Sequence, residues 1–178
     1  MKVRRSHYEL AFEAYLDRRG TPYVSVEDVR HMVKGRTGAK AFDYVVYPAA
    51  GPACLVDVKG RKFPQRSDNG DCRQKNWVTR SDVDGLLTWQ ELFGDGYEAV
   101  FVFAYWLAEP DGMPPPLFED DDILRFSGRR YRFWLAPVGE YSKHYKRLSK
   151  SWDTVCIPRD EFLKLSRSLE TIWPAAPC

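Results

Sequence analysis

The most constraining feature of this sequence is a pair of apolar segments separated by a short turn-forming stretch. Residues 41–47 and 53–59 are rich in β-branched, aromatic and aliphatic side chains, whereas residues 48–52 read Pro-Ala-Ala-Gly-Pro. This pattern predicts a β-hairpin. With the turn centred on residue 50, the numbers of paired residues sum to 100, and Asp43 is expected directly across from Asp57.

Three charged side chains are expected on one face of this hairpin. Because side chains alternate along a strand, Lys59 points to the same side as Asp57. Two carboxylates about 5 Å apart repel each other, so a compensating charge is expected. Mg²⁺ or Mn²⁺ provides it, because such ions bind carboxylates, waters and phosphate oxygens. The spacing favours metal-assisted phosphodiester hydrolysis, with Asp43 and Asp57 as ligands and Lys59 beside the attacking water or the phosphoryl oxygens.

A simpler interpretation of the acid-x-Lys triplet is chance. A chain with 25 acidic residues should contain about one such triplet by chance. Asp57 and Lys59 would then be ordinary strand residues that face solvent. The position of Asp43 in register, and the turn between the two strands, favour the functional interpretation.

Helical and strand patterns alternate around the hairpin. A helix is predicted from Ser6 to residue 19, with Gly20 as its stop, and another over 81–93. Residues 98–107 form a nearly continuous apolar run, as in a strand buried on both faces at the centre of a sheet. Other segments predicted are a strand at 22–26, a helical turn at 27–33, a structureless stretch at 60–76, a loop at 110–122, strands at 131–137 and 152–157, and a last helix from 158. The chain is therefore predicted to be one α/β domain over 1–178.

Bulk properties limit the classes of protein to consider. The net charge of +2 over 178 residues is too small to argue nucleic-acid binding without local clusters. The four cysteines contain no C-x-x-C pair, so neither zinc nor disulfides are expected. No apolar run is long enough to span a bilayer, and the N-terminus lacks the apolar segment of a signal peptide, so a cytoplasmic protein is expected.

The order of these elements resembles the PD-(D/E)xK nuclease superfamily over about residues 5–107, with Asp43 followed by Asp57-Val-Lys59. The stretch from Trp77 to Val102 is similar to archaeal Holliday-junction resolvases. Residues 7–13, His-Tyr-Glu-Leu-Ala-Phe-Glu, match the signature of the bacterial HYExAFE family. This chain departs from the pattern at Phe42, where a proline is usual, and at Asp57, where resolvases usually have glutamate.

The resemblance implies a restriction-endonuclease-like core of helix, hairpin-containing mixed sheet, helix and strand, with a C-terminal elaboration over about 123–170. It implies a Mg²⁺-dependent endonuclease acting on DNA, with branched DNA and a homodimer expected by analogy with resolvases. A helix acid completes the metal site in the superfamily, and Glu13 matches its position best. Glu9, Gln90 and His7 are further candidates, although capping, packing or a solvated face is the simpler explanation for each of them.

Two basic clusters are candidates for phosphate contact. The first contains Arg61, Lys62 and Arg66 and adjoins the acids, and the second covers residues 143–150. Two other functions remain open. One is a nucleic-acid-binding module of the same fold that does not cleave. The other is a protein-interaction domain that uses the aromatic residues Trp77, Trp106, Trp134 and Trp152.

Overall fold

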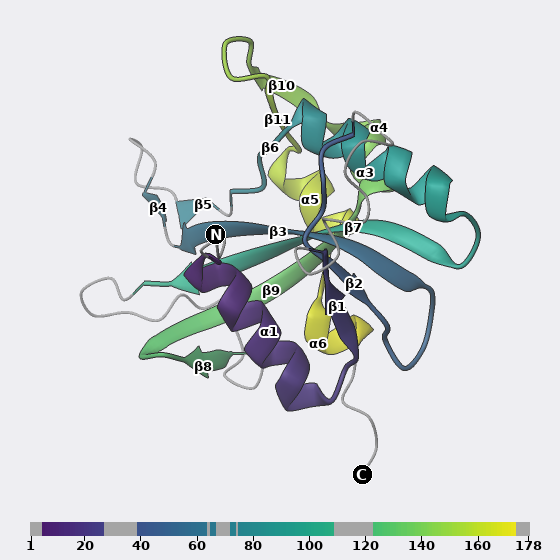
Figure 1. The fold of residues 1–178 in the computed structure, drawn as a ribbon. Helices are drawn as coiled ribbons and strands as arrows, with labels where there is room; N and C mark the ends of the chain where they lie inside the picture. The colour runs from purple at the N-terminus through teal and green to yellow at the C-terminus, as the bar shows by residue number, and fades with distance from the viewer. Residues whose placement is uncertain are drawn as a thin grey trace.

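A mixed seven-stranded sheet is the centre of the fold (Figure 1). The computed structural model describes residues 5–26, 39–63, 75–108 and 123–173, with the backbone of 65–66 and 72–73. The sheet runs in the order β1-β2-β3-β7-β9-β12, and β8 also pairs with β9. Its strands are β1 (Tyr23–Ser25), β2 (Tyr44–Val46), β3 (Ala53–Phe63), β7 (Tyr97–Leu107), β8 (Leu124–Phe126), β9 (Arg129–Pro137) and β12 (Arg167–Ser168). Only β3 and β7 pair in parallel among these described strands.

Two smaller sheets accompany the main one. The strand order in the first is β10 (Lys146–Ser149), β11 (Thr154–Cys156) and β6 (Val78–Thr79). The second pairs β4 (Gln65–Arg66) with β5 (Cys72–Arg73). Since β6 leads directly into a helix, the first small sheet is joined to the layer that covers the main sheet.

Helices cover both faces of the main sheet (Figure 1). On one face lie α1 (His7–Arg19) and α6 (Leu169–Ile172), and on the other α3 (Arg80–Phe93), α4 (Val138–His144) and α5 (Arg159–Leu165). Because side chains alternate along β3, this strand contributes to the hydrophobic cores on both faces of the sheet: Val56 packs with the α1 layer, and Leu55 with the α3 layer. Asp57, Lys59 and Arg61 share the parity of Leu55, which places their side chains on the α3 side.

The main elements predicted from the sequence are confirmed. Tyr44 pairs with Val56 and Val46 with Cys54, so the pairing numbers do sum to 100. The first helix has Ser6 as its N-cap and Gly20 as its C-cap, and β7 lies inside the sheet. The fold class is confirmed as α/β with a mixed sheet.

The prediction of a structureless stretch at 60–76 is wrong. Strand β3 continues to Phe63 because β7 pairs with it as far as Leu107, and β4 and β5 form a small ladder. Partner strands override the weak strand propensity of Gly, Arg and Lys here. The predicted helical turn at 27–33 and loop at 110–122 lie outside the described residues.

Candidate active site on the β2–β3 hairpin

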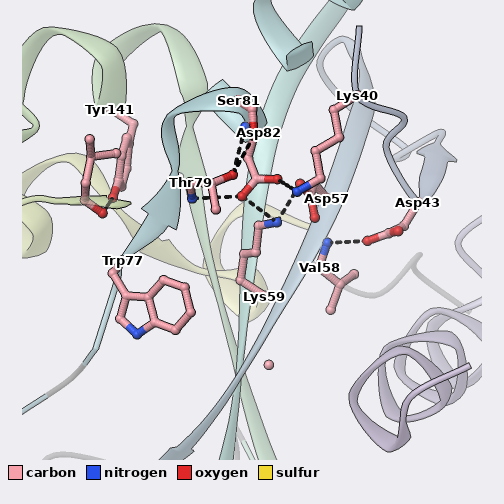
Figure 2. Close-up of polar contacts among 12 residues, drawn as sticks. Lys40, Asp43, Asp57, Val58, Lys59, Trp77, Thr79, Ser81, Asp82 and Tyr141 are labelled. Carbon is pink, nitrogen blue, oxygen red and sulfur yellow. Dashed lines mark hydrogen bonds and ion pairs between the residues drawn. The ribbon is translucent and has the colours of Figure 1, made fainter. Parts of the chain in front are cut away.

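Lys59 is the centre of a charged cluster on the α3 side of β3 (Figure 2). Its Nζ lies 2.8 Å from Oδ2 of Asp57 and 3.1 Å from Oδ2 of Asp82 on α3. The other oxygen of Asp82 accepts a hydrogen bond from Lys40 Nζ. Asp57 and Asp82 are buried, and Lys59 is largely shielded from solvent. Two cations and two anions therefore alternate in one contiguous cluster.

The start of α3 fixes Asp82 in this cluster. Thr79 is the N-cap, and its Oγ1 accepts a hydrogen bond from Asp82 N at 3.2 Å. In return, Oδ2 of Asp82 accepts from Thr79 N at 2.8 Å, which completes a capping box. The carboxylate thus caps the helix and binds Lys59 at the same time.

Backbone contacts position Lys40. A Cβ on Gly85 would lie 3.0 Å from the Lys40 carbonyl oxygen, so glycine allows α3 to pack directly against this segment. Trp89 Nε1 donates a hydrogen bond to the same oxygen at 2.9 Å. Both contacts come from α3, which therefore carries Asp82 and also holds the backbone of its cationic partner.

The cluster shifts the protonation of its members. Burial would lower the pKa of Lys59, but the Asp57 and Asp82 carboxylates raise it above its ordinary value. Burial opposes ionisation of Asp82, yet Lys59 and the hydrogen bonds of Lys40 and Thr79 lower its pKa to about 2. Burial raises the pKa of Asp57, against the attraction of Lys59. Lys59 and Asp82 are therefore charged at neutral pH.

Asp43 lies immediately before β2, next to this cluster (Figure 2). Its Oδ2 accepts a hydrogen bond from Val58 N at 2.8 Å, and its own N–H donates to Val56 O at 2.8 Å. Burial and then the Asp57 carboxylate raise the pKa of Asp43 to about 7. The hairpin therefore brings the two acids of the predicted site into electrostatic contact.

Helix α1 contributes two acids with different surroundings. Glu9 occupies the N3 position of a capping box, where its Oε2 accepts from Ser6 N at 2.7 Å. Its charge also helps to raise the pKa of Asp43. Glu13 accepts a hydrogen bond from Tyr44 Oη at 2.9 Å and pairs with Arg5 at 2.6 Å. The charge of Glu9 thus affects the pKa of Asp43, whereas Glu13 is held by Tyr44 and Arg5.

The other candidates from helices have structural partners. His7 Nδ1 lies 2.8 Å from Tyr131 Oη, and burial and the charge of Arg129 lower the pKa of His7. Gln90 Oε1 accepts a hydrogen bond from Ala99 N at 2.7 Å, which ties α3 to the start of β7. These contacts account for both side chains without a role in the charged cluster.

The first basic cluster is divided between the two faces of β3. Arg61, on the α3 side, donates to the Trp77 carbonyl and lies 4.0 Å from the centre of the Trp77 ring. Lys62 lies 5.3 Å from the Trp106 ring, which packs with the α1 layer. Arg66 belongs to β4, and its side chain is outside the described part of the structure. Arg61 is thus the member on the same side of β3 as Lys59.

Asp82 and Lys40 were not identified from the sequence. One signal for Asp82 was present: it lies next to Val83 and four residues before Leu86, both buried, on the apolar stripe of a helix. An acid on such a stripe points inward. Lys40 carried no comparable signal, because its partner lies 42 residues away in the sequence.

Asp43 and Asp57 are the carboxylates of the hairpin that could hold a divalent cation. Within the described residues, no three His, Cys, Asp or Glu side chains gather as a preformed metal site. Lys59 and Lys40 form ion pairs with Asp57 and Asp82, whereas no cation among the described residues forms an ion pair with Asp43. Mg²⁺ suits such a place, because it binds one or two carboxylates and completes its shell with waters and substrate oxygens.

Comparison with solved structures identifies the fold. The chain is similar to Hjc, a Holliday junction resolvase from the archaeal hyperthermophile Archaeoglobus fulgidus, with a TM-score of 0.51 at 16% identity. The match covers 93% of this chain and 96% of that one. The two proteins share a restriction-endonuclease-like fold. No family model and no curated protein sequence matches the chain.

The helices were also compared with the length of a membrane span. None of those in the described residues is long and apolar enough to cross a bilayer.

Proposed function

We propose that this chain is a Mg²⁺- or Mn²⁺-dependent nuclease of the PD-(D/E)xK type that hydrolyses phosphodiester bonds in DNA. The observation that carries the proposal is Asp43 beside Asp57, without an ion pair to any described cation and on the same hairpin as Lys59. Opposed acids at the edge of a folded core weaken the sheet unless a cation joins them. The fold shared with a resolvase is consistent with this chemistry but supports it only by analogy.

Each residue has a distinct role in this proposal. A bound divalent ion would supply Lewis acidity and an activated water. Asp43 and Asp57 would hold the ion, and Glu9 would add negative charge to their site. Lys59 would orient the water or stabilise the charge that develops on the phosphoryl group. Asp82 would act through Lys59, as a positioning residue that holds the ammonium in place.

The finer parts of the proposal rest on resemblance. Branched DNA is the first substrate to test, because the structural neighbour is a Holliday junction resolvase. The match of residues 7–13 to the HYExAFE signature is consistent with the structure, in which Tyr8 packs on β3 and Phe12 lies in the core. A homodimer stays a prediction that light scattering of the purified chain would test.

A second candidate is a nucleic-acid-binding module that does not cleave. One observation favours it: the ammonium of Lys59 is already engaged by two carboxylates. A lysine held in this way could serve the stability of the site rather than a reaction. The two candidates differ in whether the wild-type chain cleaves any nucleic acid at all.

The test is cleavage of a nucleic-acid panel with Mg²⁺, with Mn²⁺ and with a chelator. The panel contains four-way junctions, splayed duplexes, linear duplexes, single strands and RNA. Lys59→Ala should lower turnover by two or more orders of magnitude and leave affinity nearly unchanged, since the lost interaction belongs mainly to the transition state. Lys164→Ala, an exposed lysine of α5, is the matched control. Binding without metal-dependent cleavage of any substrate would favour the second candidate.

A further inference from the structure

The β10–β11 hairpin projects from the body of the molecule beside α3 (Figure 1). It comprises β10, a turn over residues 150–153, and β11. β10 is the outer strand of its small sheet, and none of its residues is buried. β10 and the turn therefore contribute little to the core, which the hairpin reaches only through Val155 of β11.

Two large apolar side chains of this hairpin face solvent. Trp152 is 79% exposed, the highest value for a large apolar residue in the described part of the chain, and Leu148 is 57% exposed. No ring contact of Trp152 with another described residue is present. Both faces of an indole in this position are available to a partner, and aromatic rings exposed in this way are typical of binding surfaces.

Three positively charged residues precede the exposed tryptophan on the same hairpin. Lys146, Arg147 and Lys150 are all exposed, and no ion pair joins them to the residues that the structure describes. Asp153 is the sole acid between residues 146 and 156. Three exposed cations on the same hairpin as an exposed aromatic ring complement a polyanion that also carries flat rings.

The turn of the hairpin lies next to the candidate active site. Arg80 N donates a hydrogen bond to the Asp153 carbonyl at 2.9 Å, and Thr79 pairs with Thr154. Two residues after Arg80, the Asp82 carboxylate contacts Lys59 at 3.1 Å. The hairpin is therefore joined by backbone hydrogen bonds to the start of α3, the helix that carries the Asp82 partner of Lys59.

We infer that the β10–β11 hairpin binds unpaired nucleotides next to the cleavage site, with Trp152 stacked on a base and Lys146, Arg147 and Lys150 paired with phosphates. This inference rests on the proposed function and deepens it by naming the substrate class. A duplex keeps its bases stacked on each other, so it offers only phosphates to the hairpin. An unpaired base offers a ring as well, and stacking on an aromatic side chain contributes about 1–3 kcal/mol per base.

The experiment measures equilibrium binding of the full chain in the presence of a chelator, so that cleavage plays no part. The probes are labelled oligothymidine, a blunt duplex, and the same duplex with a single-stranded overhang. Trp152→Ala should weaken binding of the single strand and the overhang by tenfold or more, and binding of the blunt duplex by less than threefold. Trp152→Phe should retain most of the affinity, because the aromatic face remains. Leu163→Ala, at an exposed apolar position on α5, is the matched control.

The cations are tested separately by their salt dependence. The triple variant Lys146→Ala, Arg147→Ala, Lys150→Ala should bind all three probes more weakly and lower the slope of log affinity against log salt by about two for the single strand. An unchanged slope would overturn the assignment of these cations to phosphate.

Other outcomes separate this inference from the proposed function. Equal losses on duplex and single strand for Trp152→Ala would overturn the preference for unpaired bases. Unchanged binding of every probe, together with a change in oligomeric state, would show that the hairpin joins protein chains and would overturn the inference. Cleavage that persists without any effect of Trp152→Ala on binding would refute the inference alone. Binding that depends on Trp152 without cleavage would refute the nuclease proposal alone.

Discussion

Replacing Asp43 with asparagine should stabilise the metal-free protein above neutral pH. The pKa of Asp43 is raised from 3.8 to about 7 by burial and by Asp57. Between these values the folded state binds a proton that the unfolded chain does not, so the free energy of unfolding falls as pH rises toward 7 and is level above it. Asparagine is uncharged and keeps an oxygen that accepts from Val58 N. It therefore removes the penalty without removing the hydrogen bond.

The size of the effect follows from the shift. Three pKa units correspond to a ceiling of about 4 kcal/mol, at about 1.4 kcal/mol per unit. Because the carboxyl is partly accessible to water, we expect about half of this, roughly 2 kcal/mol at pH 8, about 0.8 kcal/mol at pH 5 and near zero only below about pH 4. The difference between the variant and the wild type should therefore grow with pH.

The assay is urea denaturation followed by tryptophan fluorescence, in a chelator, from pH 5 to pH 8.5. Asp84→Asn, an exposed acid on α3, is the control and should change the free energy of unfolding by less than about 0.5 kcal/mol at any pH. Added Mg²⁺ should raise the melting temperature of the wild type at pH 8 but not that of Asp43→Asn. A difference that does not depend on pH, or destabilisation by Asp43→Asn at pH 8, would refute the reasoning.

Two further predictions concern the supports of the site. Asp82→Asn should destabilise the protein by about 2 kcal/mol at pH 7, because the pKa of Asp82 is lowered to about 2. The stability that the ionised Asp82 contributes is present above the unfolded pKa and is lost as pH falls toward 2. The thermal melts of the wild type and the variant should therefore converge in acid. Gly60→Ala should destabilise by about 2 kcal/mol or more, because its Cβ would lie 2.1 Å from the ring of Tyr8. Gly139→Ala, with no atom within 4 Å of its Cβ, should be nearly neutral. Tyr8→Ala should relieve the effect of Gly60→Ala. Equal melting temperatures of Gly60→Ala and Gly139→Ala would contradict the packing argument.

Local signals were sufficient to predict the elements that carry the candidate site. The first helix was predicted at its correct start because Ser6 is a residue type that favours the N-cap, which is the position it occupies. The register of the hairpin was predicted from the centre of its short turn; a slip by one residue would move Asp57 to the α1 side of the sheet. Both features depend on residues that are close in the sequence.

Long-range pairing could not be predicted from the same signals. The end of β3 is rich in glycine and cations, and it is a strand because β7 lies beside it. Lys40 meets Asp82 across 42 residues, through a helix that packs against its backbone. Neither contact leaves a periodic pattern in the sequence, because each depends on how whole elements are arranged.

The charges around Lys59 are more than the fold requires. Buried ion pairs rarely exceed the cost of removing their charges from water, and apolar residues of similar volume often serve stability as well or better. On β3, Leu55 and Phe63 show that the α3 side accepts such residues, since both are buried there. Asp57 and Lys59 lie between these two positions, and Lys59 forms a second ion pair with Asp82. Stability alone gives no reason for this choice, whereas a site that holds a cation and meets a phosphodiester needs charged groups fixed in a shielded place.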